Sequence, residues 1–301
     1  MATPSTEHLT TEQQNDNWAN LDQMDSLSIV TVMNEEDATV AAAVKKALPV
    51  IGQAVDAIVQ SLQNGGRLVY VGAGTSGRLG VLDASECPPT FSTDPEQIMA
   101  LLAGGRQAMF QAIEGAEDDE TAGRQDLVTI QLTKEDIVVG ISASGRTPYV
   151  VGALTYARAV GAGSVSLSCN VGARASACAD ISIEVETGPE VLCGSTRLKA
   201  ATAQKMILNM LSTAAMVKLG KVYTNLMVDM NPSNSKLTER ACRIVMKGAG
   251  VDRETAEEAL ERTGYETKVA LVMLKTGLGV EEARDSLRQA GGFVRSVIEA
   301  Q

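Results

Sequence analysis

Short apolar segments that alternate with helical patterns constrain the fold of this chain more than any other feature. Five such segments, each of five or six residues and mostly rich in Val, Ile and Leu, have the length of buried strands. Strands that alternate with helices are typical of a doubly wound parallel α/β sheet with helices on both faces. The predicted strands are Arg67–Val71, Gln97–Leu102, Asp136–Ile141, Ser164–Ser168 and Ile181–Val185.

Helical patterns surround this predicted sheet. Before it, apolar positions keep helical spacing from Asn34, the expected N-cap, to Leu62, and Asn64-Gly-Gly ends that helix. The later predicted helices are Tyr149–Val160, Thr196–Leu219, Glu239–Lys247, Arg253–Thr263, Tyr265–Lys275 and a last one that begins near Val280.

These elements divide the chain into four expected parts. Residues 1–33 form a polar N-terminal leader, whose first 20 residues are expected to be loosely attached. Residues 34–224 hold the sheet domain with its N-terminal helix, and residues 225–238 form a connector. Residues 239–301 form a small all-helical C-terminal domain.

Composition excludes several kinds of function. A formal net charge of -11 argues against a nucleic-acid partner, because such partners are held largely by Lys and Arg. The five cysteines include no CxxC pair, and neither a signal-peptide core nor an apolar run of membrane-spanning length is visible, which predicts a reduced, cytoplasmic protein. The only histidine, His8, lies in the leader, so that neither a Ser-His-Asp triad nor a His-rich metal site is expected. Proton transfer is therefore left to carboxylates, Lys, Tyr or Cys.

Two turns rich in Gly, Ser and Thr follow the first and third predicted strands. They read Gly72-Ala-Gly-Thr-Ser-Gly-Arg and Ser142-Ala-Ser-Gly-Arg-Thr-Pro. Glycines let the backbone approach a ligand, and free N–H groups at a helix start favour an anion. Because ligands of such sheets bind outside the carboxyl ends of the strands, we expect the two turns to hold one phosphate. The expected binding residues are Gly74, Thr75, Ser76, Ser142, Ser144 and Thr147, and the candidate cations are Arg78, Arg146, Arg197 and Lys199.

Two other interpretations of these turns are open. The spacing Gly72-x-Gly74-x-x-Gly77 formally fits a dinucleotide-binding turn, but the acidic residues 94–96 precede the second strand, where the motif needs one after it. The turns could also be ordinary strand-to-helix turns with capping hydroxyls. Two such turns in one sheet favour the phosphate site.

Longer motifs around the turns resemble a known family. The segments Gly72–Thr90, Ile113–Asp118, Ser142–Tyr149 and Asn225–Asp229 are similar to motifs of the N-acetylmuramic acid 6-phosphate etherases, which belong to the sugar isomerase (SIS) domain family. The similarity runs from about Asn17 to the C-terminus. It implies an SIS-type fold, Ser195 as a further substrate-binding residue, and neither a metal nor a cofactor. The chain departs from the family pattern at Cys193, Thr196 and Ala201.

The resemblance implies a carbon–oxygen lyase of cell-wall amino-sugar recycling. The family cleaves the D-lactyl ether of N-acetylmuramic acid 6-phosphate by elimination and hydration, which gives N-acetylglucosamine 6-phosphate and D-lactate. Glu86 and Glu117 match the family's catalytic pair, with Glu86 as the acid for the leaving lactate and Glu117 as the proton-transfer partner. Without the resemblance, both would be interpreted as surface carboxylates. We expect the adjacent Pro88-Pro89 to form a stiff corner that excludes water from Glu86.

The resemblance also implies a homodimer in which a neighbouring subunit often completes the site. The predicted helix 34–63 is a candidate for that contact. Two alternatives are a sugar-phosphate isomerase and a non-catalytic sugar-phosphate sensor similar to the glucokinase regulatory proteins. The sensor should lack one or both carboxylates, whereas this chain has both.

Overall fold

The computed structural model describes residues 9–230, 232 and 234–301, which form two compact units. The first unit runs up to Ser85 and continues over Glu96–Ser212. The second joins Glu86–Pro95 to Thr213–Gln301. The domain boundaries expected from the sequence stay a prediction.

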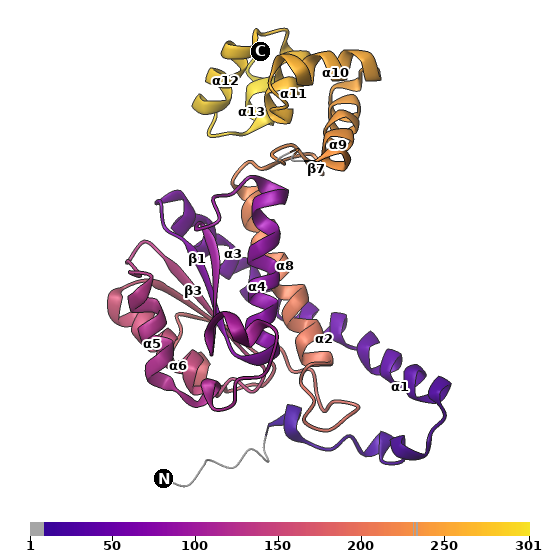
Figure 1. Ribbon diagram of the computed structural model, residues 1–301, viewed down its shortest axis with the longest axis vertical. Coiled ribbons are helices and arrows are strands. Elements are labelled where there is room, and N and C mark those ends of the chain that lie inside the picture. The colour runs from indigo at the N-terminus through magenta and orange to yellow at the C-terminus, as the bar shows by residue number, and fades with distance from the viewer. Residues whose placement is uncertain (1–8, 231, 233) are drawn as a thin grey trace. The chain divides into compact units, whose positions relative to one another are not determined.

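A five-stranded parallel sheet with the order β2-β1-β3-β4-β5 forms the centre of the first unit (Figure 1). The observed ends lie within one residue of the predicted ends for every strand, which confirms the predicted α/β class. The strands are β1 (Leu68–Gly72), β2 (Ile98–Leu102), β3 (Ile137–Ser142), β4 (Gly163–Ser168) and β5 (Ile181–Glu184).

Helices cover both faces of this sheet (Figure 1). On one face, α5 (Glu120–Thr129) and α6 (Pro148–Val160) bury an apolar cluster against β1 and β3. On the other face lie α3 (Leu48–Gln63) and α4 (Gly74–Phe91), and α8 (Lys199–Lys218) packs along α4. The remaining short elements are α7 (Arg174–Ala177) and the 3-10 turns Gly105–Met109 and Ala116–Asp118.

The N-terminal helix differs from its prediction. It begins eight residues earlier than Asn34, as α1 (Ser26–Ala38), because the Asp25 carboxylate caps it by accepting a 2.8 Å bond from the Ser28 amide. It then breaks into α2 (Val40–Lys46) and α3, and Pro49 in the first turn of α3 explains the second break, since proline lacks the N–H that a continuous helix would use. No single described helix is long and apolar enough to cross a membrane; α1 and α2 pass that test only together with α3, across a bend of 63°.

The leader is more firmly attached than expected. Leu9 and Thr11 are buried, and the Asn170 side chain accepts a bond from the Thr10 hydroxyl and donates one to the Thr11 hydroxyl. The prediction of a loose leader is therefore wrong for this stretch, while His8 lies outside the described residues. Three 3-10 turns follow at Thr10–Glu12, Asp16–Trp18 and Leu21–Gln23.

The second unit contains a small helical bundle. A buried cluster of mainly Ala, Val, Leu and Ile side chains joins its helices, and a two-stranded hairpin precedes them. The predicted C-terminal helices are confirmed, although the first begins four residues earlier, where Asn234 caps it, and a fifth short helix was not predicted. The elements are β6 (Val222–Tyr223), β7 (Leu226–Met227), α9 (Ser235–Val245), a π-helical turn (Met246–Gly250), α10 (Arg253–Arg262), α11 (Thr267–Thr276), α12 (Val280–Gln289) and α13 (Val294–Glu299).

Candidate active site

The turn after β3 gathers three hydroxyl groups around one bend. The Ser142 Oγ atom lies 2.8 Å from Thr147 Oγ1 and 3.4 Å from Ser144 Oγ. Gly145 has a φ of +68°, and an added Cβ there would lie 2.3 Å from the Ala173 Cβ, so that the bend requires glycine. The predicted grouping of Ser142, Ser144 and Thr147 is thus present in the structure.

The turn after β1 lies beside this hydroxyl cluster. Gly72 at the end of β1 is in register with Ile141, the residue before Ser142 on β3, so that both strands leave the sheet at the same level. Gly74 then opens α4 with a φ of +51° and is exposed, and Thr75 is half-buried. The two predicted turns therefore meet at one edge of the sheet, where α4 and α6 both begin.

Ser76 has a partner that the sequence did not predict. Its buried hydroxyl donates a 2.9 Å hydrogen bond to Oε1 of Gln204 on α8. The other end of that amide, Nε2, is buried and has no partner among the described residues. Gln204 stands 128 positions after Ser76, so that local sequence pattern could not connect the two.

Glu117 lies at a pocket that reaches the first turn. The pocket has a volume of about 340 Å³ and is lined by Gly74, Arg78 and Glu117, among others. Glu117 stands in the 3-10 turn Ala116–Asp118, directly after Gly115, whose φ of +75° turns the chain. The Arg78 Nε atom donates to the carbonyl oxygens of Ala108 and Met109, which fixes this guanidinium in the pocket wall. An acidic and a basic side chain thus share one cavity with the start of α4.

Glu86 lies near the other end of α4, in the second unit. Its side chain is exposed. The helix runs through Pro88 and Pro89 to Phe91, so that the expected Pro-Pro corner that would keep water from Glu86 is wrong. The structure places Glu117 in the first unit and Glu86 in the second, so that their pairing stays a prediction.

Asp83 is a buried carboxylate that the sequence interpretation did not identify. Tyr70, Asn209 and Ser212 donate hydrogen bonds of 2.9, 2.7 and 3.1 Å to it. Burial raises the pKa of Asp83, although these three donors and Lys205 act in the opposite direction. The carboxylate ties α4 to β1 and α8, one turn before Glu86. The sequence feature that could have identified Asp83 is its place as an acidic residue within an apolar stretch of a helix.

The predicted residues around the start of α8 do not all face a ligand site. Lys199 is buried, and its ammonium lies 2.5 Å from Glu36 Oε2, while its role as a cation for the phosphate or the lactate carboxylate stays a prediction. Glu190 accepts bonds from the amides of Lys199 and Ala200, while burial raises the pKa of its carboxyl.

Ser195 is half-buried in the loop before α8, and no hydrogen bond joins its hydroxyl to either turn among the described residues. Arg197 is exposed and Arg146 half-buried.

The side chains that could bind a metal ion are scattered over the structure. In the part of the chain that the structure describes, no group of three or more His, Cys, Asp or Glu side chains could hold a metal ion. The candidate site in the first unit therefore combines the hydroxyls of the two turns and the start of α4 with Glu117 and Arg78 of the adjoining pocket.

Models of protein families match most of the chain in three pieces. The N-terminal SIS domain of glucokinase regulatory protein matches residues 50–158, and the SIS domain matches residues 117–214. The C-terminal lid domain of glucokinase regulatory protein matches residues 224–270. The last match assigns the helical region after the sheet to a lid.

Solved structures support the fold alone. A phosphoheptose isomerase from Francisella tularensis has a TM-score of 0.53 at 20% identity, and the match covers 64% of this chain and 100% of the isomerase. A putative phosphosugar isomerase from Bacteroides fragilis NCTC 9343 has a TM-score of 0.50 at 17% identity, covering 64% of this chain and 91% of the other.

Relatives of known name match almost the full length. The N-acetylmuramic acid 6-phosphate etherase of Geobacillus thermodenitrificans is 55% identical over 97% of this chain and 99% of its own. The etherase of Halalkalibacterium halodurans is 54% identical over 96% and 97%, and that of Bacillus subtilis is 54% identical over 97% and 96%. Since more than half of the residues are identical over nearly complete chains, this protein belongs to the N-acetylmuramic acid 6-phosphate etherase family.

Proposed function

We infer that this chain is a carbon–oxygen lyase that cleaves the D-lactyl ether of N-acetylmuramic acid 6-phosphate. The observation that carries the inference is the 55% identity to a Geobacillus etherase over 97% of one chain and 99% of the other. In the proposed complex, the hydroxyls of Ser142, Ser144 and Thr147 and the start of α4 bind the phosphate. The phosphate anchors the sugar and takes no part in bond breaking.

The proposed reaction is an elimination followed by a hydration. In the open-chain sugar, the C1 aldehyde acidifies the proton on C2, so that a base can remove it. The C3–O bond then breaks, and an acid protonates the departing lactate oxygen. Water adds across the new C2–C3 double bond, with its hydroxyl on C3 and its proton on C2. The products are N-acetylglucosamine 6-phosphate and D-lactate, and no net proton is consumed.

We propose Glu117 and Glu86 as the two proton-transfer groups. Glu117 has the support of geometry, because it lines the pocket that also contains Gly74 and Arg78. For Glu86 the support is its match to the family motif, with the lactate oxygen as the proposed acceptor of its proton. Each Glu→Gln variant should lower kcat by about 10²- to 10⁴-fold with a smaller change in KM. Glu114→Gln is the matched control, since Glu114 lines the same pocket as Glu117 and has no assigned role.

A direct assay tests the function. The protein is incubated with N-acetylmuramic acid 6-phosphate in H₂¹⁸O, and D-lactate and the sugar product are analysed by mass spectrometry. The elimination predicts D-lactate without the label and one ¹⁸O on C3 of the sugar, beyond any exchange at the aldehyde. Sugar-phosphate binding without lactate would favour the sensor, and a ketose product would favour an isomerase.

We also propose that the protein works in the cytoplasm as a homodimer. All five cysteines are free, which suits a reducing compartment. Two large apolar side chains of α1, Leu27 and Val30, are 75% and 57% exposed, which suits burial against another chain.

A further inference from the structure

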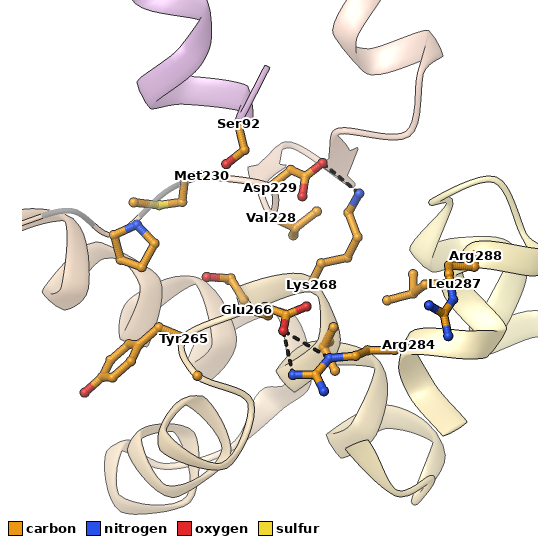
Figure 2. Close-up of a pocket in the computed structure, with 14 residues that line it drawn as sticks. Ser92, Val228, Asp229, Met230, Tyr265, Glu266, Lys268, Arg284, Leu287 and Arg288 are labelled. Carbon is orange, nitrogen blue, oxygen red and sulfur yellow. Dashed lines mark hydrogen bonds and ion pairs between the residues drawn. The ribbon is translucent and has the colours of Figure 1, made fainter. Parts of the chain in front are cut away.

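The second unit contains a pocket that no predicted site residue lines. Its volume is about 520 Å³, within the range of pockets that hold small metabolites. It lies where α11 begins, and Figure 2 shows Lys268, Glu266 and Arg284 around it, with Asp229 and Met230 on the opposite side.

The start of α11 offers unused hydrogen-bond donors to this pocket. The amides of Thr267, Lys268 and Val269, all of which line it, donate to no acceptor among the described residues. The Glu266 side chain does not cap the helix, because its carboxylate accepts two bonds from Arg284 instead (Figure 2). An uncapped N-terminus of a ten-residue helix favours an anion through its free N–H groups and its dipole.

The second observation at the same place is a buried hydroxyl group. The Thr267 side chain is only 2% exposed, and its hydroxyl has no hydrogen-bond partner in the described part of the chain. A buried hydroxyl without a partner costs stability, and such groups call for an acceptor or donor that binds there. A phosphate oxygen at the helix start would accept from this hydroxyl.

Charge at the pocket also suits an anion. The Lys268 and Lys221 ammonium groups lie 3.0 and 2.9 Å from the same Asp229 oxygen, so that one carboxylate serves two cations. The two ammonium groups and the carboxylate together have a net charge of one positive unit, and the Lys268 side chain is only 13% exposed. Burial and the neighbouring Lys221 lower the pKa of Lys268, whereas Asp229 raises it.

We propose that this pocket binds the phosphate group of a small phosphorylated metabolite. The amides at the start of α11, the Thr267 hydroxyl and the Lys268 ammonium bind the phosphate oxygens, and the rest of the cavity accommodates the organic part. The source of the phosphate is either a sugar phosphate of the reaction itself or another metabolite. The proposal does not depend on the proposed etherase activity.

Calorimetric titration of the full chain tests the proposal. Inorganic phosphate, N-acetylglucosamine 6-phosphate, glucose 6-phosphate and D-lactate are titrated into a Ser142→Ala/Ser144→Ala background, which weakens the turn site. We expect phosphate binding to persist there, with a Kd that rises about tenfold on Lys268→Met, as loss of one charged contact implies. Tighter binding of N-acetylglucosamine 6-phosphate than of glucose 6-phosphate would identify the reaction's own sugar phosphate as the source, and the reverse or equal affinity would identify another metabolite.

Two further variants separate binding from folding. Lys275→Met is the matched control, because Lys275 is an exposed lysine at the other end of α11 and should leave the Kd unchanged. Thr267→Val keeps the shape of the side chain and removes the unpartnered hydroxyl. It should therefore weaken phosphate binding while the ligand-free protein melts at the same or a higher temperature.

Hydrogen exchange gives an independent measurement. Phosphate should slow exchange of the amides of residues 267–269 in the wild type and not in Lys268→Met. The proposal is overturned if Lys268→Met and Thr267→Val bind phosphate as well as the background does, or if D-lactate binds and the phosphate compounds do not.

Discussion

At the residue scale, Gln204 controls which way the Ser76 hydroxyl can direct its proton. In the structure the hydroxyl donates to Gln204 Oε1, while Gln204 Nε2 is buried without a partner in the described chain. A half-turn of the amide exchanges its oxygen and nitrogen at nearly the same positions. In the turned form Nε2 donates to Ser76, whose proton is then free for a phosphate oxygen. Binding of the substrate would favour this form.

Substitution of Gln204 therefore tests the role of Ser76. We expect Gln204→Glu to raise KM about tenfold or more, because a carboxylate can only accept from Ser76 and adds negative charge near the phosphate. Gln204→Met should raise KM less, since it removes the partner without adding charge. Steady-state kinetics with N-acetylmuramic acid 6-phosphate measures both, and thermal melting of each variant controls for folding. A Gln204→Glu enzyme with the wild-type KM would contradict the role given to Gln204.

At the element scale, the first turn depends on close contact between α4 and β1. An added Cβ on Gly77 would lie 2.5 Å from the Gly72 carbonyl oxygen and 2.4 Å from Leu102 Cδ1. The helix start can approach the strand end only because both Gly72 and Gly77 lack side chains.

Gly77→Ala should therefore displace the start of α4. We expect a loss of about 1–3 kcal/mol in the free energy of unfolding from overpacking, together with a raised KM. Gly52→Ala is the matched control, because Gly52 lies in α3 with nothing within 4 Å of its added Cβ. That variant should instead stabilise the protein by up to about 1 kcal/mol, since alanine favours helix. Urea unfolding followed by circular dichroism gives both values, and equal effects would refute the packing argument.

The strands and their turns could be predicted because each depends on a few adjacent residues. The apolar runs had strand length, the first and third were followed by Gly and Ser, and the structure placed all five within one residue. The predicted start of the N-terminal helix was wrong because both Asn34 and Asp25 are suitable N-cap residues, and the structure uses Asp25. The break before α3 could have been predicted from Pro49. Long-range pairs gave no such signal, as for Lys199 and Glu36, which form an ion pair although they lie 163 positions apart in the sequence.

The edge of the sheet opposite the site is held by a buried ion pair. Asp136, at the start of β3, accepts bonds from the Arg67 amide and guanidinium and from the Thr133 amide and hydroxyl. These donors hold the pKa of Asp136 below its ordinary value of 3.8, although burial acts against them. Ionised Asp136 thus stabilises β1 and β3 without contributing to the site.

Asp136→Asn should therefore reduce stability in a pH-dependent manner and leave KM unchanged. Since the folded pKa is lowered, the stabilisation by wild-type Asp136 is complete above pH 3.8 and is lost as the pH falls through the folded pKa. We expect a deficit of about 2–4 kcal/mol at pH 7 that narrows in acid. Urea unfolding between pH 3 and 7 checks this, and a deficit that is constant over that range would contradict it.

At the scale of the whole molecule, the proposed site depends on parts that the chain supplies from separate units. The phosphate turns, Glu117 and Arg78 belong to the first unit, and Glu86 belongs to the second. The sequence motifs identified both glutamates, but the number of residues between them does not determine their distance in the fold.

The exposed apolar side chains of α1 predict that two chains associate. Leu27 and Val30 on α1 are largely exposed and three positions apart, so that they lie on one side of the helix. We expect sedimentation to give a mass of about twice 31.6 kDa for the wild type, and Leu27→Glu/Val30→Glu to shift it toward the monomer, because two buried carboxylates would oppose the contact. Val171→Glu is the matched control, as Val171 is 67% exposed on a loop of the same unit. If the double variant stays dimeric, α1 is not the contact. If it is monomeric and still releases lactate at the wild-type rate, the neighbouring subunit does not complete the site.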